Sequence, residues 1–222
     1  MMSGRPFFLT AFRRNCHEPP TPMIHMFMPF LLGFWGSIMG PSQSGPSFMI
    51  DPGSTLEIHG SSNVNTFICL CRQSFVPMPW SSSGDLEPGQ GEWRFKNTRL
   101  TLQTQLFDCG NKVMNKDFYL ALKAKEHPRM QIELQSIEKG QVIGPAWTTL
   151  ATHTLITIAG RSRQVPIHAK VRRLTSTKLQ VIAEKPLKMT DFGIHPPTAL
   201  MGMIKTNDDI TIHMNLILHI LG

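Results

Sequence analysis

Asp191-Phe192-Gly193 is the first place where the residue types suggest chemistry, because this tripeptide holds magnesium in protein kinases. Kinase chemistry also needs an H-R-D catalytic loop upstream and a glycine-rich loop over the phosphates, and the sequence contains neither. We therefore predict an architectural role for this stretch. Asp191 is suited to cap the turn after Leu187–Met189, and Gly193 is suited to a positive φ.

The histidines and hydroxyl side chains form no catalytic or metal-binding pattern. The nine histidines include no H-E-x-x-H and no His-x-His, and His59 is isolated along the chain. His213 and His219 share one strand but lie too far apart to hold the same ion. There is also no G-x-S-x-G elbow. We therefore expect no catalytic residue, no metal site and no enzymatic activity.

The positive charge of the chain is diffuse. The formal net charge is +7, and the densest basic cluster is Lys170, Arg172 and Arg173, with Arg161 and Arg163 shortly before it. No basic stripe is interleaved with aromatic residues, as it is in single-strand binders. We therefore expect no nucleic-acid partner.

Met26–Met39, the run MFMPFLLGFWGSIM, is continuously apolar and precedes the small residues GPSQSGPS. It is shorter than the roughly 20 residues that span a bilayer, but it suits the apolar region of a secretory signal. We predict that residues 1–44 are a leader with a signal peptide, cleaved near Ser42 or Ser44. The mature domain, residues 45–222, would then be periplasmic or extracellular, with no stable transmembrane anchor. The alternative is that the run is an uncleaved anchor or a buried strand.

The cysteines fit an exported protein. Cys16 lies before the apolar run, so it is not the lipid-modified residue of a lipoprotein signal, which must follow such a run. Cys69, Cys71 and Cys109 remain, and an odd number indicates one disulfide and one free thiol. A metal site is less favoured, because the spacing lacks Cys-x-x-Cys.

Most of the chain after Ser54 alternates with period two, which is typical of strands with one buried face. The same alternation predicts strands over 163–173, 179–189 and 130–134, and a more uniformly apolar strand over 150–159. In the last segment one parity is apolar, and it comprises Ile210, Ile212, Met214, Leu216, Leu218 and Ile220. Short strands without a βαβ rhythm indicate an antiparallel barrel or sandwich.

One segment, Asn111–His127, has helical spacing instead, with Met114, Phe118 and Leu122 on one stripe. We predict that Asn115 caps the helix and that His127-Pro128 ends it. Ser74–Gly91 is a long stretch rich in Pro, Gly and Ser that also carries aromatic residues. It is either a lid over an apolar site or a plain connector.

Four stretches together resemble the YceI-like family, the bacterial lipocalin-like proteins known as polyisoprenoid binders. They are LEIHGSSNVNTFICLC (Leu56–Cys71), FDCGNKVMNKDFYLALKAKEHPRMQIEL (Phe107–Leu134), TLITIAGRSRQVPI (Thr154–Ile167) and LKMTDFGIHPPTALMGMIKTNDDITI (Leu187–Ile212). They occur in the order found in the family and cover most of Leu56–Leu221.

The resemblance implies an all-β, mainly antiparallel fold, an eight-stranded lipocalin-like barrel with one short helix. Its elongated apolar interior would hold an isoprenoid, a quinone-like lipid or another long-chain amphiphile. The family also implies export, and a disulfide between Cys69 and Cys109 that leaves Cys71 as the spare thiol. Cys71 shares strand parity with Cys69, so the swapped pairing stays open.

The residues expected to line the ligand come from three parts of the chain. The apolar parity of the last strand supplies Ile210, Ile212, Met214, Leu216 and Leu218, the helix supplies Phe118 and Leu122, and the Met189–Gly202 stretch supplies Met189, Phe192, Leu200 and Met201. The sequence thus predicts a non-enzymatic, exported lipid-binding protein. The alternative is a ligand-free structural or envelope-stress module that acts through protein contacts.

Overall fold

The computed structural model describes residues 47–75, 78–79, 81–82, 91–96, 98–138 and 142–221. All of them belong to one compact unit, Gln43–Gly222. The leader and signal peptide predicted for residues 1–44 lie outside the described residues. So does most of the predicted lid or connector, namely residues 76–77, 80 and 83–90.

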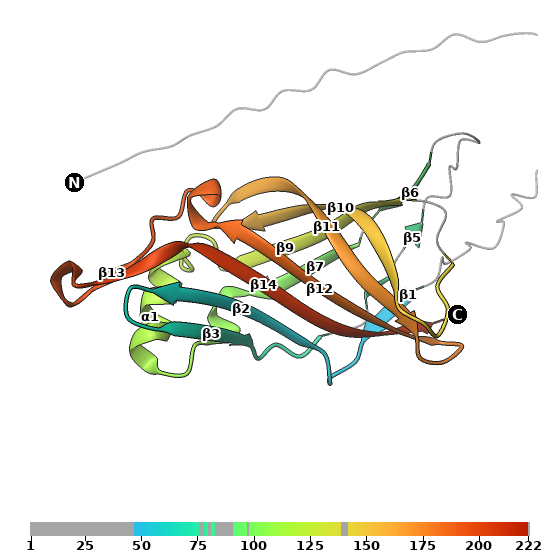
Figure 1. The fold of residues 1–222 in the computed structure, drawn as a ribbon, viewed down its shortest axis with the longest axis horizontal. Helices are drawn as coiled ribbons and strands as arrows, with labels where there is room; N and C mark the ends of the chain where they lie inside the picture. The colour runs from blue at the N-terminus through green and yellow to red at the C-terminus, as the bar shows by residue number, and fades with distance from the viewer. Residues whose placement is uncertain are drawn as a thin grey trace, which may run out of the picture. The chain divides into compact units, whose positions relative to one another are not determined.

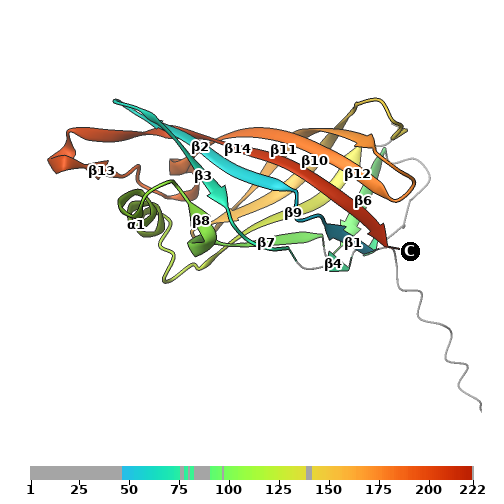
Figure 2. The same cartoon turned by 90° about the horizontal axis from the view of Figure 1, so that it is seen from below.

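The described residues form strands, one α-helix and short 3-10 helices, arranged as Figures 1 and 2 show. The strands are β1 (Ser47–Ile50), β2 (Thr55–Ser62), β3 (Thr66–Cys71), β4 (Met78–Pro79), β5 (Ser81–Ser82), β6 (Glu92–Lys96), β7 (Arg99–Gln103), β8 (Phe107–Asp108), β9 (Arg129–Glu138), β10 (Thr148–Ile158), β11 (Arg161–Arg173), β12 (Lys178–Lys188), β13 (Thr198–Ala199) and β14 (Ile204–Leu221). The helices are α1 (Lys112–Ala121), η1 (Thr104–Leu106), η2 (Met189–Phe192) and η3 (Leu200–Gly202).

The strands close into a barrel whose pairings are antiparallel. Around the ring, β14 pairs with β2, β2 with β3, β3 with β8, β7 with β9, and then β9, β10, β11, β12 and β14 follow in order. This confirms the predicted all-β barrel with one helix. The strand count is higher than the predicted eight, because short strands are added at the ends and η1 divides one wall into β7 and β8.

The divided wall closes the barrel between β3 and β9. Its first half, β7, pairs with β9, whereas its second half, β8, pairs with β3. Where the strand ladder is interrupted, the Gln73 side chain makes two hydrogen bonds with the backbone of β7. Its amide nitrogen donates to the carbonyl of Thr101 at 2.8 Å, and its oxygen accepts from the backbone N–H of Gln103 at 2.7 Å.

The alternation read from the sequence matches the two faces of the long strands. In β11 the inward residues Val165, Ile167, Ala169 and Val171 are all buried, while the residues between them are exposed or partly exposed. In β12, Leu179, Ala183 and Leu187 are buried in the same way. The register of β12 against β14 places these side chains beside the apolar parity of β14. The hydrophobic core therefore fills the inside of the barrel.

The helix lies in the predicted segment, but both of its ends differ from the prediction. Asn111, not Asn115, is the N-cap, and its side chain accepts a hydrogen bond from the backbone N–H of Met114. Asn115 lies inside α1, where its side chain binds Cys109 and Asp108 instead. The helix ends at Ala121, well before Pro128, because Lys123 has a positive φ of 51°.

The Asp191-Phe192-Gly193 stretch forms the end of η2 and the turn after it, and Asp191 does not cap this turn, contrary to the prediction. Gly193 ends η2 with φ 66°, which confirms the predicted positive φ. The capping carboxylate is Asp208 of β14, which accepts from the backbone N–H of Thr190 at 2.9 Å and from its hydroxyl at 2.6 Å. Asp208 lies near Thr190 because β14 pairs with β12 as far as Lys188 and Asp209, and η2 follows β12 directly.

Candidate functional site

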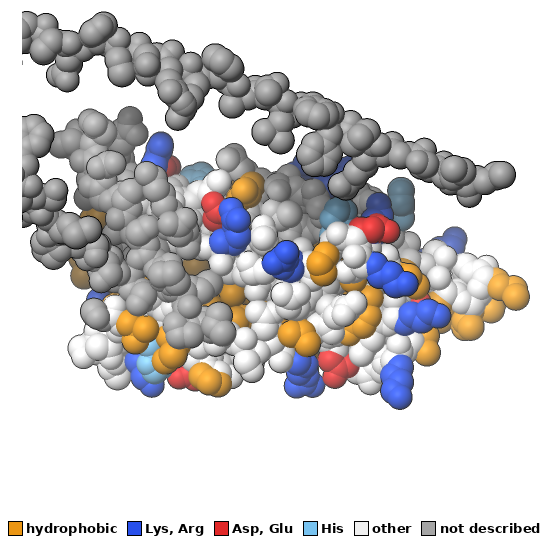
Figure 3. Space-filling view, turned by 180° about the vertical axis from the view of Figure 1, so that it is seen from behind, with side chains coloured by type: hydrophobic (Ala, Val, Ile, Leu, Met, Phe, Trp, Pro, Cys, Tyr) orange, Lys and Arg blue, Asp and Glu red, His pale blue; other side chains and the backbone are white. Residues whose placement is uncertain are grey.

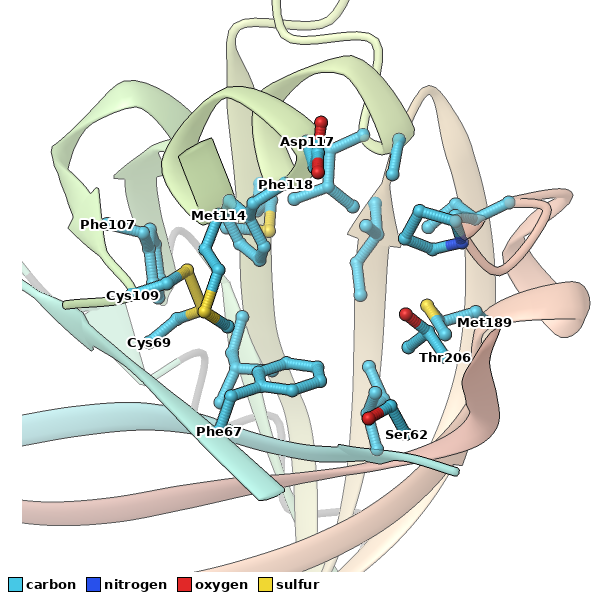
Figure 4. Close-up of a pocket in the computed structure, with 18 of the residues that line it drawn as sticks. Ser62, Phe67, Cys69, Phe107, Cys109, Met114, Asp117, Phe118, Met189 and Thr206 are labelled. Carbon is cyan, nitrogen blue, oxygen red and sulfur yellow. A yellow bond between two sulfur atoms is a disulfide. The ribbon is translucent and has the colours of Figure 1, made fainter. Parts of the chain in front are cut away.

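An apolar cavity of about 440 Å³ occupies one end of the barrel, beneath α1. Figure 4 shows α1, β2, β3 and the segment around Met189 and Thr206 surrounding it. Its walls are the inward faces of several strands, α1, η2 and the chain before β14. The lining residues include Leu56, Ile58, Phe67, Cys69, Leu102, Phe107, Met114, Phe118, Leu122, Met130, Ile132, Ile156, Ile158, Met189, Phe192, Ile194, Leu200, Ile204, Ile210 and Ile212.

The deep wall of the cavity is apolar and fully buried. Phe107, Ile156 and Phe192 are each 1% exposed, and Leu56 and Ile194 are 2% exposed. The Phe107 and Phe118 rings lie 5.7 Å apart at a tilt of 36°, so α1 packs on the barrel end through aromatic contact. Such a wall offers dispersion contacts and no hydrogen-bonding group to what it encloses.

A disulfide between Cys69 of β3 and Cys109, which precedes α1, forms part of the wall. It is the pairing that the family resemblance implied, and it leaves Cys71 as the free cysteine among the described residues. Burial raises the pKa of the Cys71 thiol. Figure 4 shows the disulfide beside Met114, facing the cavity. The bond ties the start of α1 to the barrel wall.

Polar side chains gather toward the outer part of the cavity. Asn65, Asn111 and Thr198 are exposed, and Ser62 and Asp117 are partly exposed. Asp117 is the one carboxylate among the lining residues. The site therefore has an apolar interior and a polar rim, an arrangement that suits an amphiphile entering tail first.

The Asn63-Val64-Asn65 turn positions one side of this rim. The side-chain amide of Asn63 donates to the carbonyl of Met203 at 2.9 Å and accepts from the backbone N–H of Lys205 at 2.8 Å. The Ser62 hydroxyl accepts from the backbone N–H groups of Val64 and Asn65. These bonds hold the turn between β2 and β3 against the β13–β14 hairpin.

The eleven residues expected to line a ligand divide into three groups. Phe118, Leu122, Met189, Phe192, Leu200, Ile210 and Ile212 lie in the cavity wall. Met214, Leu216 and Leu218 also face inward, but they pack against the buried core instead of lining this cavity. Met201 was expected at the barrel end, and this is wrong: the side chain is fully exposed, at 107%, because η3 turns it into solvent.

Sequence reasoning missed most of the opposite wall. Leu56, Ile58, Ile156 and Ile158 line the cavity from β2 and β10, and none of them was among the expected residues. Their alternation could have identified them as inward-facing, because each pair is two residues apart on one face of a strand. Parity shows that such residues face inward, but not at which height along the barrel they lie.

Outside the barrel, β2 and β14 bring together two histidines that are far apart in the sequence. The rings of His59 and His213 lie 3.9 Å apart. Glu57 contacts His59 at 2.7 Å, and Glu184 lies 3.4 Å from His213. Within the described part of the chain, no group of three or more His, Cys, Asp or Glu side chains is arranged to hold a metal ion.

Two carboxylates near the end of the barrel that contains the cavity, Asp208 and Asp108, accept hydrogen bonds that hold neighbouring segments in place. Hydrogen bonds from the side chain and the backbone N–H of Thr190 lower the pKa of Asp208. The pKa of Asp108 is lowered by hydrogen bonds from the Asn115 side chain and the Gly110 backbone, and by nearby Arg72. Both remain ionised at neutral pH and act as fixed acceptors for the segments that frame the cavity.

No helix in the described ranges combines the length and apolar character needed to cross a bilayer.

A search of curated protein sequences found no significant match. Several solved structures resemble the fold, including the following two. A polyisoprenoid-binding domain from Saccharophagus degradans has a TM-score of 0.56 at 12% identity, covering 79% of this chain and 98% of its own. BcnA of Burkholderia cenocepacia has a TM-score of 0.55 at 16% identity, covering 76% of this chain and 99% of its own.

The family comparison rests on sequence and covers most of the barrel. The model of the YceI-like domain matches residues 77–218, well over half of the chain. This range contains three of the four stretches that carry the resemblance, namely Phe107–Leu134, Thr154–Ile167 and Leu187–Ile212. The chain therefore belongs to the YceI-like family.

Proposed function

We propose that this protein is a non-enzymatic carrier that holds a polyisoprenoid or another long-chain amphiphile in the cavity beneath α1. The observation that carries the proposal is the cavity itself, about 440 Å³ in volume with a fully buried apolar wall. This volume lies within the range of roughly 300–1,000 Å³ that is common for small-molecule sites. A polyisoprenoid-binding domain among the similar structures supports the choice of ligand class.

The energetics favour a slim apolar chain. Each buried methylene contributes about 0.8 kcal/mol, so ten to twelve buried carbons contribute roughly 8–10 kcal/mol. This gain is comparable with the estimated cost of association, about 4–15 kcal/mol. The polar rim around Asn65, Asn111 and Thr198 would keep the headgroup hydrated at the mouth.

We also propose that the protein is exported to the bacterial envelope. The signal-like run Met26–Met39 supports this, and so does the disulfide between Cys69 and Cys109, because such bonds persist in oxidising compartments. The mass of the mature protein isolated from its native host tests export directly. A mature chain that still begins with residues 1–44 and carries both thiols free would contradict it.

The carrier proposal is tested by extracting lipid from protein purified from native cells and identifying it by mass spectrometry. We expect a long-chain amphiphile in stoichiometric amount. Ile210→Phe should reduce this amount, because the larger side chain fills the cavity. Leu216→Phe is the matched control, since Leu216 faces inward from the same strand but lies outside the cavity wall. Repeated preparations without lipid would favour the ligand-free alternative.

A further inference from the structure

The β13–β14 hairpin exposes apolar side chains beside the mouth of the cavity. Met201 is fully exposed, and Met203 is 69% exposed. Val64, in the adjoining turn between β2 and β3, is 62% exposed. We call these three side chains the apolar tip. Figures 1 and 2 place the hairpin at the same end of the barrel as α1.

The backbone of the hairpin holds this exposure in place. Leu200, Met201 and Gly202 have φ values of 48°, 55° and 89°, so three successive residues lie in the left-handed region. Residues with a Cβ atom seldom adopt this region. The bonds from Asn63 to Met203 and Lys205 fix the hairpin against the neighbouring turn. Strain of this kind is characteristic of functional segments, and here it presents methionines to solvent.

The apolar tip is continuous with the cavity. Leu200, next to Met201 in the hairpin, lines the cavity and is itself 63% exposed. Val113, at the start of α1, also lines the cavity and is exposed. An amphiphile leaving the cavity would therefore pass the apolar side chains of Leu200 and Val113, which lie beside the polar groups of the rim, on its way to the tip.

The charges around the tip are complementary to an anionic lipid surface. The hairpin from Thr198 to Lys205 contains no acidic residue, and Lys205 is exposed at its end. Lys112 and Lys116 are exposed on α1, on the other side of the mouth. Figure 3 shows hydrophobic side chains at the projecting end, with Lys and Arg side chains nearby. Apolar side chains flanked by lysines are typical of segments that rest in a bilayer interface.

We propose that the apolar tip docks on the surface of a lipid bilayer containing anionic lipid, so that the amphiphile moves between membrane and cavity without entering water. This inference rests on the proposed carrier function, because it assigns a source to the same ligand. Met201, Met203 and Val64 enter the interface, and Lys112, Lys116 and Lys205 contact anionic headgroups. Met side chains suit this role because they adapt to irregular apolar surroundings.

Sedimentation with vesicles tests the proposal. The protein is mixed with vesicles of phosphatidylethanolamine and phosphatidylglycerol, and the bound fraction is measured for the wild type and for a variant with Val64→Ser, Met201→Ser and Met203→Ser. We expect the partition coefficient of the variant to fall by about tenfold or more, because three apolar side chains no longer enter the interface. Added salt should weaken wild-type binding, because the lysine contribution is screened.

The matched control removes exposed apolar side chains from the opposite end of the barrel. Val142→Ser, Leu174→Ser and Leu221→Ser lie before β10, after β11 and at the end of β14. This variant should bind vesicles like the wild type. Equal loss in both variants, or no loss in the tip variant, would overturn the proposal. If the tip variant loses no vesicle binding, a protein partner would explain the exposed tip better than a bilayer does.

A second measurement separates this inference from the carrier function. Binding of a fluorescent geraniol derivative is titrated in solution without vesicles. The tip variant should retain the wild-type affinity, because none of its three residues lines the cavity. Wild-type protein that binds the probe but not the vesicles would refute docking and leave the carrier function intact. Wild-type protein that binds vesicles but not the probe would refute the carrier function on which this inference rests.

Discussion

The aromatic ring of Phe67 occupies the space in which a Cβ atom on residue 60 would lie. Gly60 and Phe67 are directly paired on β2 and β3, and both face the inside of the barrel. The absence of a side chain at Gly60 leaves room for the outer edge of the ring above this residue. The ring therefore lies over Gly60 while it lines the cavity.

Gly60→Val should therefore push the Phe67 ring into the cavity. We expect the affinity for a fluorescent geraniol derivative to fall by about tenfold, which corresponds to about 1.4 kcal/mol of binding free energy. The free energy of unfolding should fall by about 1–3 kcal/mol, as is typical of overpacking. Gly144→Ala is the control, because a Cβ atom there meets no neighbour within 4 Å. Unchanged probe affinity in Gly60→Val would contradict this role of the glycine.

The disulfide should be a major source of stability. It closes a loop with a sequence separation of 40 residues, which in the chain-entropy model contributes about 3–4 kcal/mol. Replacing Cys69 and Cys109 together by Ala should lower the free energy of unfolding, measured in urea, by about this amount. Cys71→Ala should change it by less than about 1 kcal/mol. A larger effect of Cys71→Ala than of the double replacement would show that another pair of cysteines is linked.

The sequence predicted the strands well because one face of each is buried. In β11 the alternation of Val165, Ile167, Ala169 and Val171 with polar residues reflects burial directly. The helix ends were less predictable, because Asn111 and Asn115 are chemically equivalent caps. Only the folded chain brings Cys109 and Asp108 to Asn115 and so occupies its side chain.

The cavity was harder to predict than the barrel. Ile212 and Leu216 have the same parity on β14, but only Ile212 lines the cavity. The difference depends on the side chains that other strands place at each height, and parity along one strand does not contain this information. Met201 shows a second limit. This apolar residue was expected inside, but the backbone of the hairpin lies in the left-handed region at Met201 and turns its side chain into solvent.

The cap of η2 should make stability depend on pH in the acidic range. The pKa of Asp208 is lowered by the hydroxyl and backbone N–H of Thr190, so the folded state favours the carboxylate. This stabilisation is present above the ordinary aspartate pKa of about 4 and is lost as the pH falls through the lower pKa of the folded state. In urea unfolding at several pH values, Asp208→Asn should lose less stability on acidification than the wild type.

Thr190→Val is the control for this pH effect. It removes the hydroxyl donor but keeps the backbone N–H that also binds Asp208. Its acid-dependent loss of stability should lie between those of the wild type and Asp208→Asn. If all three proteins lose the same stability between neutral pH and pH 3, Asp208 is not the group responsible.

Asp117 should select against anionic headgroups at the mouth of the cavity. It is the one carboxylate in the lining, so a fatty-acid headgroup at the rim would face a like charge, whereas an alcohol would not. Asp117→Asn keeps the size of the side chain and removes the charge. We expect the affinity for a fluorescent fatty acid to rise by about three- to tenfold, which is the scale of a partly screened pair of charges. The affinity for the geraniol derivative should stay within about twofold, because its headgroup is neutral. Equal increases for both probes would mean that Asp117 acts through the shape or hydration of the rim and not through its charge.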